Sequence, residues 1–132
     1  MEYGHVKLRE QLGLLSGPVE EFKKSAEAEH NAMLNMLVKE GYLDADVLED
    51  ELANENEIVD ALYRGLKGSP CKLLAASIVD AVGEKRAQNQ PGTNNEYPNW
   101  RIPLADGDGN VVPLEELFGN ARLQEIAAIM RG

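Results

Sequence analysis

A long stretch without hydrophobic periodicity limits the folds that this chain can adopt. It runs over residues 84–100 and reads EKRAQNQPGTNNEYPNW. Its amides, prolines, glycine and threonine are typical of a loop, and they fit neither a helix nor a strand. Loops this long are uncommon inside a compact domain and are often functional. We therefore expect periodic segments on both sides of one long loop that carries candidate functional residues.

Two segments ahead of the loop have the apolar spacing of helices. In the first, over residues 18–40, Pro18 suits the first helical position and Gly41 supplies the stop. In the second, over residues 57–67, an apolar stripe follows Asn56, which is a plausible N-cap. These patterns predict two amphipathic helices before the loop.

The segment from Lys72 to Val82 has two interpretations. Its apolar residues match one face of a helix, yet Leu73–Ile78 (LLAASI) is also an apolar run of the length of a buried strand. Periodicity alone does not separate these two structures. Gly83 ends the segment in either case.

A hairpin and a final helix are expected after the loop. Residues 101–104 and 110–112 flank an Asp-Gly-Asp-Gly turn, and Asp-Gly readily adopts the positive φ that hairpin turns need. Pro103 and Pro113 would keep the two strands short. A last helical stretch follows, with an interruption at Gly119. The predicted fold class is thus mainly α with a short β-hairpin.

Charge and composition limit the possible partners. The chain has 23 acidic and 13 basic residues and a net charge of −10, which argues against nucleic acid and anionic membrane surfaces as partners. No signal peptide is visible, and no apolar run approaches the ~20 residues of a membrane span. Cys71 is the single cysteine, so no intrachain disulfide can form, and we expect a cytoplasmic location. A neutral ligand such as a sugar fits this balance.

The sequence predicts no metal site and no cofactor. The stretch from Asp106 resembles the start of a calcium loop, but its sixth position is Val111 and its twelfth is Leu117, where glycine and glutamate are needed. His5 and His30 lack companions at zinc-ligand spacing.

The loop over residues 88–101 has the chemical groups that sugar sites use. A planar aromatic ring stacks on the apolar face of a pyranose, and amides with a guanidinium pair with vicinal hydroxyls. Pro91 and Gly92 hold the backbone in a fixed turn close to Trp100 in sequence. From the residues alone, an anchored surface loop without a ligand is the stronger interpretation.

The segment AQNQPGTNNEYPNWRIPLADGDGN resembles the C-terminal region of the amylomaltases, the 4-α-glucanotransferase family, in its actinobacterial form. The preceding Ser69-Pro70, the apolar run Leu73–Ile78 and Asp80-Ala81-Val82-Gly83 follow the order of that family. The resemblance is strong over residues 69–118 and weaker over 12–68.

This resemblance implies both a fold and an activity. The family folds as a (β/α)8 barrel, of which residues 1–132 would be the C-terminal segment. In this arrangement residues 1–68 would be a helical part, 69–118 the last barrel strand (Leu73–Ile78), loop and hairpin, and 119–132 the C-terminal helix. The family transfers α-1,4-glucan segments with retention of configuration, which requires two carboxylates about 5 Å apart. The family's carboxylates lie upstream of this segment, so no catalytic residue is expected here, and the chain alone is expected to be inactive.

The resemblance places the loop at the C-terminal face of the barrel, where such enzymes have their active sites. The candidate substrate-binding residues are Asn89, Pro91, Gly92, Thr93, Asn99 and Trp100. The expected partners are an α-1,4-glucan or maltooligosaccharide and the N-terminal barrel that this segment lacks.

Two other functions remain open at this point. One is a small acidic helical module without catalytic activity that docks a protein through residues 18–40 and 57–67. The other is a glucan-binding domain that works alone. The barrel interpretation differs from the helical module in a visible way, because it predicts an exposed apolar patch around residues 70–80, where the barrel would continue.

Overall fold

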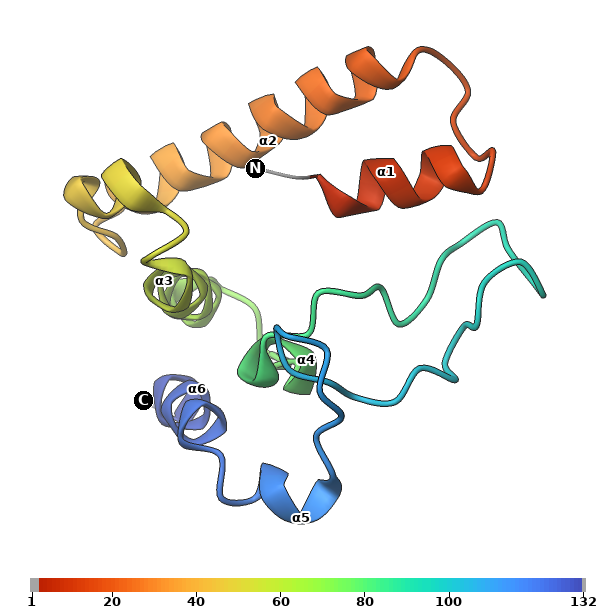
Figure 1. Cartoon of the computed structure of the whole chain (residues 1–132). Helices are drawn as coiled ribbons and strands as arrows, with labels where there is room; N and C mark the ends of the chain where they lie inside the picture. The colour runs from red at the N-terminus through yellow and green to blue at the C-terminus, as the bar shows by residue number, and fades with distance from the viewer. Residues whose placement is uncertain (1–2, 132) are drawn as a thin grey trace.

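The computed structural model describes residues 3–131, which form an array of helices around one long loop (Figure 1). The helices are α1 (Gly4–Gln11), α2 (Val19–Lys39), the 3-10 helix η1 (Ala45–Asp50), α3 (Glu55–Gly68), α4 (Ile78–Val82), α5 (Leu114–Leu117) and α6 (Ala121–Arg131). Residues 3–131 contain no β-strand, so the mainly helical fold is confirmed. None of the helices in this part of the chain is long and apolar enough to cross a membrane.

Helix α2 confirms the helix expected over residues 18–40. Pro18, however, is the N-cap and not the first helical residue, because its ψ of 133° is extended. At the other end Gly41 takes a φ of 76° and donates to the carbonyl of Val38, while Tyr42 donates to the carbonyl of Leu37. This pair of bonds is the glycine-dependent stop that the sequence indicates.

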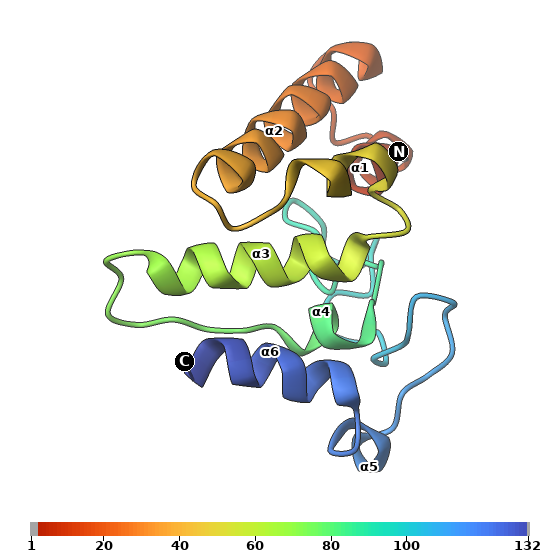
Figure 2. The same ribbon diagram turned by 90° about the vertical axis from the view of Figure 1, so that its left-hand side faces the viewer.

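Helix α3 lies between two small cores, as Figure 2 shows with α2 on one side and α6 on the other. The first core is built by α2, η1, α3 and the connection between α2 and η1, from Leu34, Leu37, Leu43, Val47, Ile58 and Ala61. The second joins α3 to α4 and α6 through Tyr63, Ala81 and Ile126. The central position of α3 follows from its wide apolar stripe, which packs Ile58 and Ala61 into the first core and Tyr63 into the second.

The expected start of α3 is wrong by two residues. The N-cap is Asn54 and not Asn56, and the helix begins at Glu55. The Asn54 side chain makes no cap hydrogen bond, and its Nδ2 donates to the carbonyls of Val47 and Asp50 in η1. The side chain therefore ties the two helices together.

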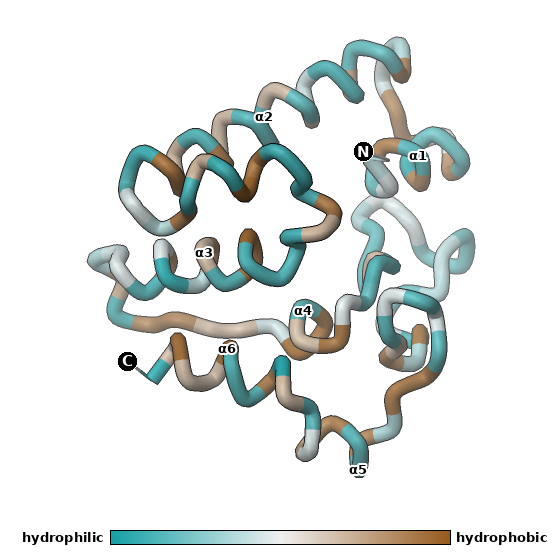
Figure 3. The backbone as a smooth tube through the Cα atoms, turned by 60° about the vertical axis from the view of Figure 1, so that its left-hand side comes forward, coloured by the Kyte–Doolittle hydropathy of each residue, from teal (hydrophilic) through white to brown (hydrophobic). Residues whose placement is uncertain are grey.

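The segment from Lys72 to Val82 is helical only at its end. Residues 71–77 have an irregular course between α3 and α4, and the helix begins at Ile78. Figure 3 shows this apolar stretch running between α3 and α6 without coiling. Gly83, with a φ of 73°, ends α4 as expected. A strand over Leu73–Ile78 would need neighbouring strands, so that assignment stays a prediction.

The expected β-hairpin does not form as a pair of strands. A single antiparallel bridge joins Ala105 to Val111, with the Asp106 and Asn110 backbones bonded over 2.9 Å at the turn. Proline has no N–H for a ladder, and Pro103 and Pro113 flank the bridge at both ends. The turn itself is as expected, because Gly109 has a φ of 88°.

The C-terminal helical stretch is interrupted at Gly119, as predicted. It forms the short α5 and then α6, with the side chain of Asn120 accepting a hydrogen bond from the Leu123 N–H over 2.9 Å. This bond satisfies one of the free N–H groups at the start of α6. Residue 132, the last of the expected C-terminal helix, lies outside the described residues.

Candidate functional site

The loop over residues 88–101 leaves the body of the molecule after α4 and returns to it before the Ala105–Val111 bridge (Figure 1). Its ends are joined directly, because the Trp100 N–H donates to the carbonyl of Gln88 over 2.8 Å. Beside this bond the Tyr97 hydroxyl donates to the carbonyl of Ala87 over 2.6 Å. The loop is therefore a closed, cross-linked arch.

The side chain of Asn99 is the centre of this cross-linking. Its Oδ1 accepts the backbone N–H of Gln90 over 2.7 Å, and its Nδ2 donates to Oγ1 of Thr93 over 2.9 Å. The Thr93 hydroxyl in turn donates to the carbonyl of Gln90 over 2.7 Å. Because these groups satisfy one another while half-buried, the arch has a preferred geometry without any ligand.

The tip of the arch is held as well. Gly92 has a φ of 88°, and a Cβ at this position would lie 3.4 Å from Cδ2 of Leu14, in the connection between α1 and α2. The Asn94 N–H donates to the Glu96 carboxylate over 2.7 Å, and this bond is the main reason why the pKa of Glu96 is lowered. The tip thus rests against the N-terminal helical hairpin.

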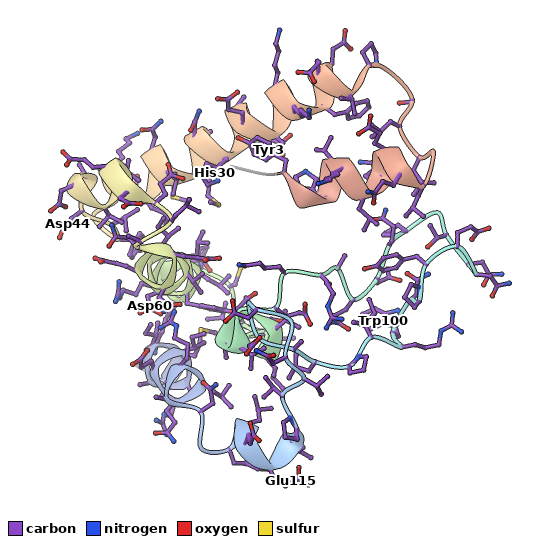
Figure 4. All side chains as sticks on the ribbon, viewed as in Figure 1. Tyr3, His30, Asp44, Asp60, Trp100 and Glu115 are labelled. Carbon is purple, nitrogen blue, oxygen red and sulfur yellow. The ribbon has the colours of Figure 1, made fainter. Side chains whose placement is uncertain are left out.

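Trp100 is the most unusual residue of the loop. It has a φ of 58° and is the only non-glycine residue with a positive φ among residues 3–131. Its side chain is nevertheless 77% exposed, and Figure 4 shows it on the long loop away from the helices. A bulky residue in the left-handed region is strained, and such strain is concentrated at functional sites. The arch therefore holds a large apolar ring out in the solvent.

The six predicted site residues all lie on this arch, but they fall into two groups. Asn89, Pro91, Gly92 and Trp100 are exposed. Thr93 and Asn99 are half-buried and bonded within the loop. The structure adds Gln90, which is buried and whose backbone is held by both Thr93 and Asn99. A glutamine inside an amide-rich loop carries no sequence signal that would set it apart.

The base of the arch contains an ion pair that sequence reasoning missed. The Glu84 carboxylate accepts from the Arg86 guanidinium at 2.9 and 2.6 Å and from the Ala105 N–H at 3.0 Å. These hydrogen bonds, first of all those from Arg86, lower the pKa of Glu84 to about 2. Arg86 also donates to the carbonyl of Pro103 over 2.8 Å. Both residues lie in the stretch 84–100, whose composition indicates only a loop.

A second surface feature is the apolar segment that precedes α4. Leu73 is 91% exposed and Ile78 is 48% exposed, and the intervening Ala75 and Ala76 are exposed too. Such a run of solvated apolar side chains is the patch that the barrel interpretation predicts around residues 70–80. A closed helical module would instead bury it.

Other regions offer less chemistry. A hollow of about 960 Å³ lies between α1, α2 and η1, where lysines such as Lys23 alternate with glutamates such as Glu27, and it does not reach the loop. At one wall the His30 ring is 2.8 Å from the Glu51 carboxylate. Among residues 3–131 no cluster of three or more potential metal ligands exists. The exposed indole on a cross-linked amide-rich arch is thus the best-formed candidate site, and its chemistry suits the stacking of a flat apolar face.

Comparison with known proteins identifies the family. The family model of the 4-alpha-glucanotransferases matches residues 15–107. This match covers most of the chain, including the whole of the arch. The chain therefore belongs to the 4-alpha-glucanotransferase family, as its resemblance to the amylomaltases implies.

Individual relatives agree with this assignment. The 4-alpha-glucanotransferase of Mycobacterium tuberculosis is 47% identical over 96% of this chain, and that of Haemophilus influenzae is 30% identical over 90%. The crystal structure of amylomaltase from Corynebacterium glutamicum superposes with a TM-score of 0.78 and 33% identity over 97% of this chain. The chain spans only 17% of the length of the first two relatives and 19% of the third.

Proposed function

We propose that this chain is the C-terminal part of a 4-α-glucanotransferase that transfers α-1,4-glucan segments between maltooligosaccharides in the cytoplasm. In this proposal the arch forms one wall of the glucan-binding cleft. The observation that carries it is Trp100, which is 77% exposed on a cross-linked loop of a chain that belongs to this family.

The exposed groups of the arch have the chemistry for glucan binding. The Trp100 ring offers a flat apolar surface for the apolar face of a glucose unit, and the Asn89 amide can both donate to and accept from hydroxyls. Pro91 and Gly92 would let a sugar approach the backbone closely. Thr93 and Asn99 would support the shape of the arch, because their polar groups already bond to each other and to Gln90.

The reactive carboxylates would lie outside this chain. We propose that the exposed segment Leu73–Ile78 completes a (β/α)8 barrel as its last strand, with residues 1–68 as a helical part and 119–132 as the final helix. The exposure of Leu73 and Ile78 supports this proposal, because both would be covered by neighbouring strands. The partner of this chain is then the remaining barrel, and the chain alone has no transferase activity.

The family match disfavours a small acidic helical module as the alternative. The faces of α2 and α3 that such a module would offer to a partner are partly used inside the chain, where Leu34, Leu37 and Ile58 pack in one core. An isolated glucan-binding domain remains compatible with an exposed arch, and it would bind maltoheptaose without the barrel.

Transferase activity tests the proposal in a chimeric enzyme, in which this chain replaces the matching segment of the Mycobacterium tuberculosis relative. Trp100→Ala should raise the KM for maltooligosaccharides about tenfold or more, equivalent to about 1.4 kcal/mol of lost binding. Trp100→Phe, which keeps a flat ring, should retain most of the affinity. Leu52→Ala is the matched control, because Leu52 is also 77% exposed but belongs to the helical part. An inactive chimera, or a Trp100→Ala variant with the parental KM, would contradict the proposal.

A further inference from the structure

Both ends of the arch converge on one buried carboxylate. Before the arch, the Glu84 Oε1 accepts the backbone N–H and the Nε–H of Arg86, each over 2.9 Å. After the arch, the Glu84 Oε2 accepts the Ala105 N–H over 3.0 Å. The Arg86 guanidinium spans the same gap, since it donates to Oε2 over 2.6 Å and to the carbonyl of Pro103 over 2.8 Å. The two ends of the loop are therefore joined by charge-assisted bonds, which are stronger than neutral ones.

This junction is fixed to the body of the molecule. The Glu84 N–H donates to the carbonyl of Val79 in α4 over 3.0 Å, and Gly83 turns the chain there with a φ of 73°. Helix α4 in turn contributes Ala81 to the core that it shares with Tyr63 of α3 and with α6. The direction in which the arch leaves the body is thus determined where Glu84 sits.

Glu84 has no surface of its own to offer a ligand. Its side chain is only 2% exposed, whereas that of Arg86 is 45% exposed. Both carboxylate oxygens already accept two hydrogen bonds each, so none is available for a sugar hydroxyl. A buried group with this arrangement acts on the site only through the backbone that it holds.

We propose that Glu84 is a positioning residue that sets the orientation of the arch, through Arg86 and the Ala105 backbone, and thereby the affinity for glucan. The proposal rests on the proposed function of the arch, but its structural half can be measured on the chain alone. Without Glu84 the arch keeps its internal Asn99 bonds and loses its fixed attachment. The ring of Trp100 then samples many orientations. Glucan binds only to the fraction of molecules with the productive orientation, which lowers the apparent affinity.

Hydrogen exchange of the 132-residue chain separates local loosening from general instability. Glu84→Gln keeps the shape of the side chain and cannot accept all four bonds. Exchange of the amides of Ala105 and Trp100 should become roughly tenfold faster or more, while amides of α2 keep their rates. Glu125→Gln is the matched control, because Glu125 also pairs with an arginine, Arg122, over 2.9 Å and lies in α6. Unchanged exchange at Ala105 and Trp100, or equal acceleration throughout the chain, would overturn the proposal.

A second variant keeps the proposal testable if Glu84→Gln does not fold. Arg86→Lys keeps the positive charge on a half-exposed side chain and removes the forked contact between Glu84 and Pro103. It should accelerate exchange at Trp100 in the same local pattern, to a smaller extent. Wild-type exchange rates at Trp100 in this variant would overturn the proposal as well.

Kinetics of the chimeric enzyme test the functional half. Glu84→Gln should raise the KM for maltooligosaccharides several-fold and leave kcat nearly unchanged, because the catalytic groups are not touched. A lowered kcat at unchanged KM would overturn the positioning role. A different result would contradict the proposed function alone. In that case Trp100→Ala leaves the KM unchanged, while hydrogen exchange still shows that Glu84→Gln loosens the arch.

Discussion

The arch over residues 88–101 and the segment over residues 71–76 are both exposed and irregular, yet they differ in how their polar backbone is satisfied. In the arch, backbone and side chains bond to one another around Asn99 and between Trp100 and Gln88. Within residues 3–131, residues 71–76 form no backbone-to-backbone hydrogen bond. The arch also exposes polar groups beside one aromatic ring, whereas the segment exposes aliphatic side chains such as Leu73.

This difference supports the two kinds of partner proposed above. A loop that satisfies its own hydrogen bonds needs no further protein to hold its shape, and it can present its ring to a small molecule. An apolar segment with an unpaired backbone has the properties of a strand at an open sheet edge, which is a template for further strands. The first region is complete in this chain, and the second has the exposure expected if the proposed barrel continues outside it.

Leu73→Asp should have the largest effect on stability. It should distinguish the exposed segment of the 132-residue chain from the same segment inside the proposed barrel. In the 132-residue chain Leu73 is 91% exposed, so the free energy of unfolding should change by no more than about 0.5 kcal/mol. In the chimeric enzyme, an unpaired carboxylate inside the barrel should cost about 3–5 kcal/mol. Urea unfolding of both proteins measures the difference. Leu52→Asp, at another exposed leucine, should be mild in both, and an equally mild Leu73→Asp in the chimera would contradict the barrel assignment.

Asn99→Ala should destabilise the arch itself. It leaves the Gln90 N–H without its acceptor and removes a donor from Thr93, which should cost about 2–3 kcal/mol. Because the arch adds little to the helical cores, the loss should appear as faster hydrogen exchange at Gln90 before it appears in global unfolding. Asn95→Ala, on the exposed tip, is the control and should change neither quantity. Equal exchange at Gln90 in the two variants would show that the cross-links do not order the loop.

Tyr63→Phe should affect the end of the apolar segment. The Tyr63 hydroxyl accepts the Ser77 N–H over 2.9 Å and donates to Asp80 over 2.6 Å, which fixes the point where the segment enters α4. Loss of both bonds should lower the free energy of unfolding by about 1–2 kcal/mol. Urea unfolding monitored by far-UV circular dichroism measures this change. An unaltered stability would mean that α4 is held by its core contacts alone.

Acid should loosen the base of the arch only at very low pH. The pKa of Glu84 is lowered to about 2 from an ordinary 4.5, so its contribution to stability is complete above pH 4.5 and is lost as the pH falls through about 2. Trp100 is the only tryptophan, and its near-UV circular dichroism should therefore report this loss directly. Glu84→Gln should abolish the transition, and a wild-type midpoint near 4.5 would contradict the buried ion pair.

The sequence predicted the parts of the fold that depend on local patterns. Gly41 and Gly83 stop helices where glycine stops were expected, and the loop lies where periodicity ceases. The strands beside the Asp-Gly turn failed because Pro103 and Pro113 leave room for one bridge only. The Leu73–Ile78 run was ambiguous for a physical reason, since a short apolar run has the same pattern in a buried strand and in a helix.

In the candidate site, too, local sequence patterns were informative and contacts between distant residues were not predictable. The residue types of the arch allowed a sugar-binding loop, and the family resemblance implied one. The exposure of Trp100 is compatible with that hypothesis. The roles of Glu84 and Arg86 were not predictable, because their significance lies in contacts with Pro103 and Ala105, far along the chain. No spacing rule connects a carboxylate to a backbone N–H across a loop.

Hydrogen exchange of the chimeric enzyme with and without maltoheptaose tests the central claim most directly. If the arch is a wall of the glucan cleft, peptides that cover residues 88–101 should exchange more slowly with saturating maltoheptaose, while those from α2 should not change. If exchange over residues 88–101 stays the same while the enzyme is saturated with glucan, the arch does not bind the substrate and the account is wrong.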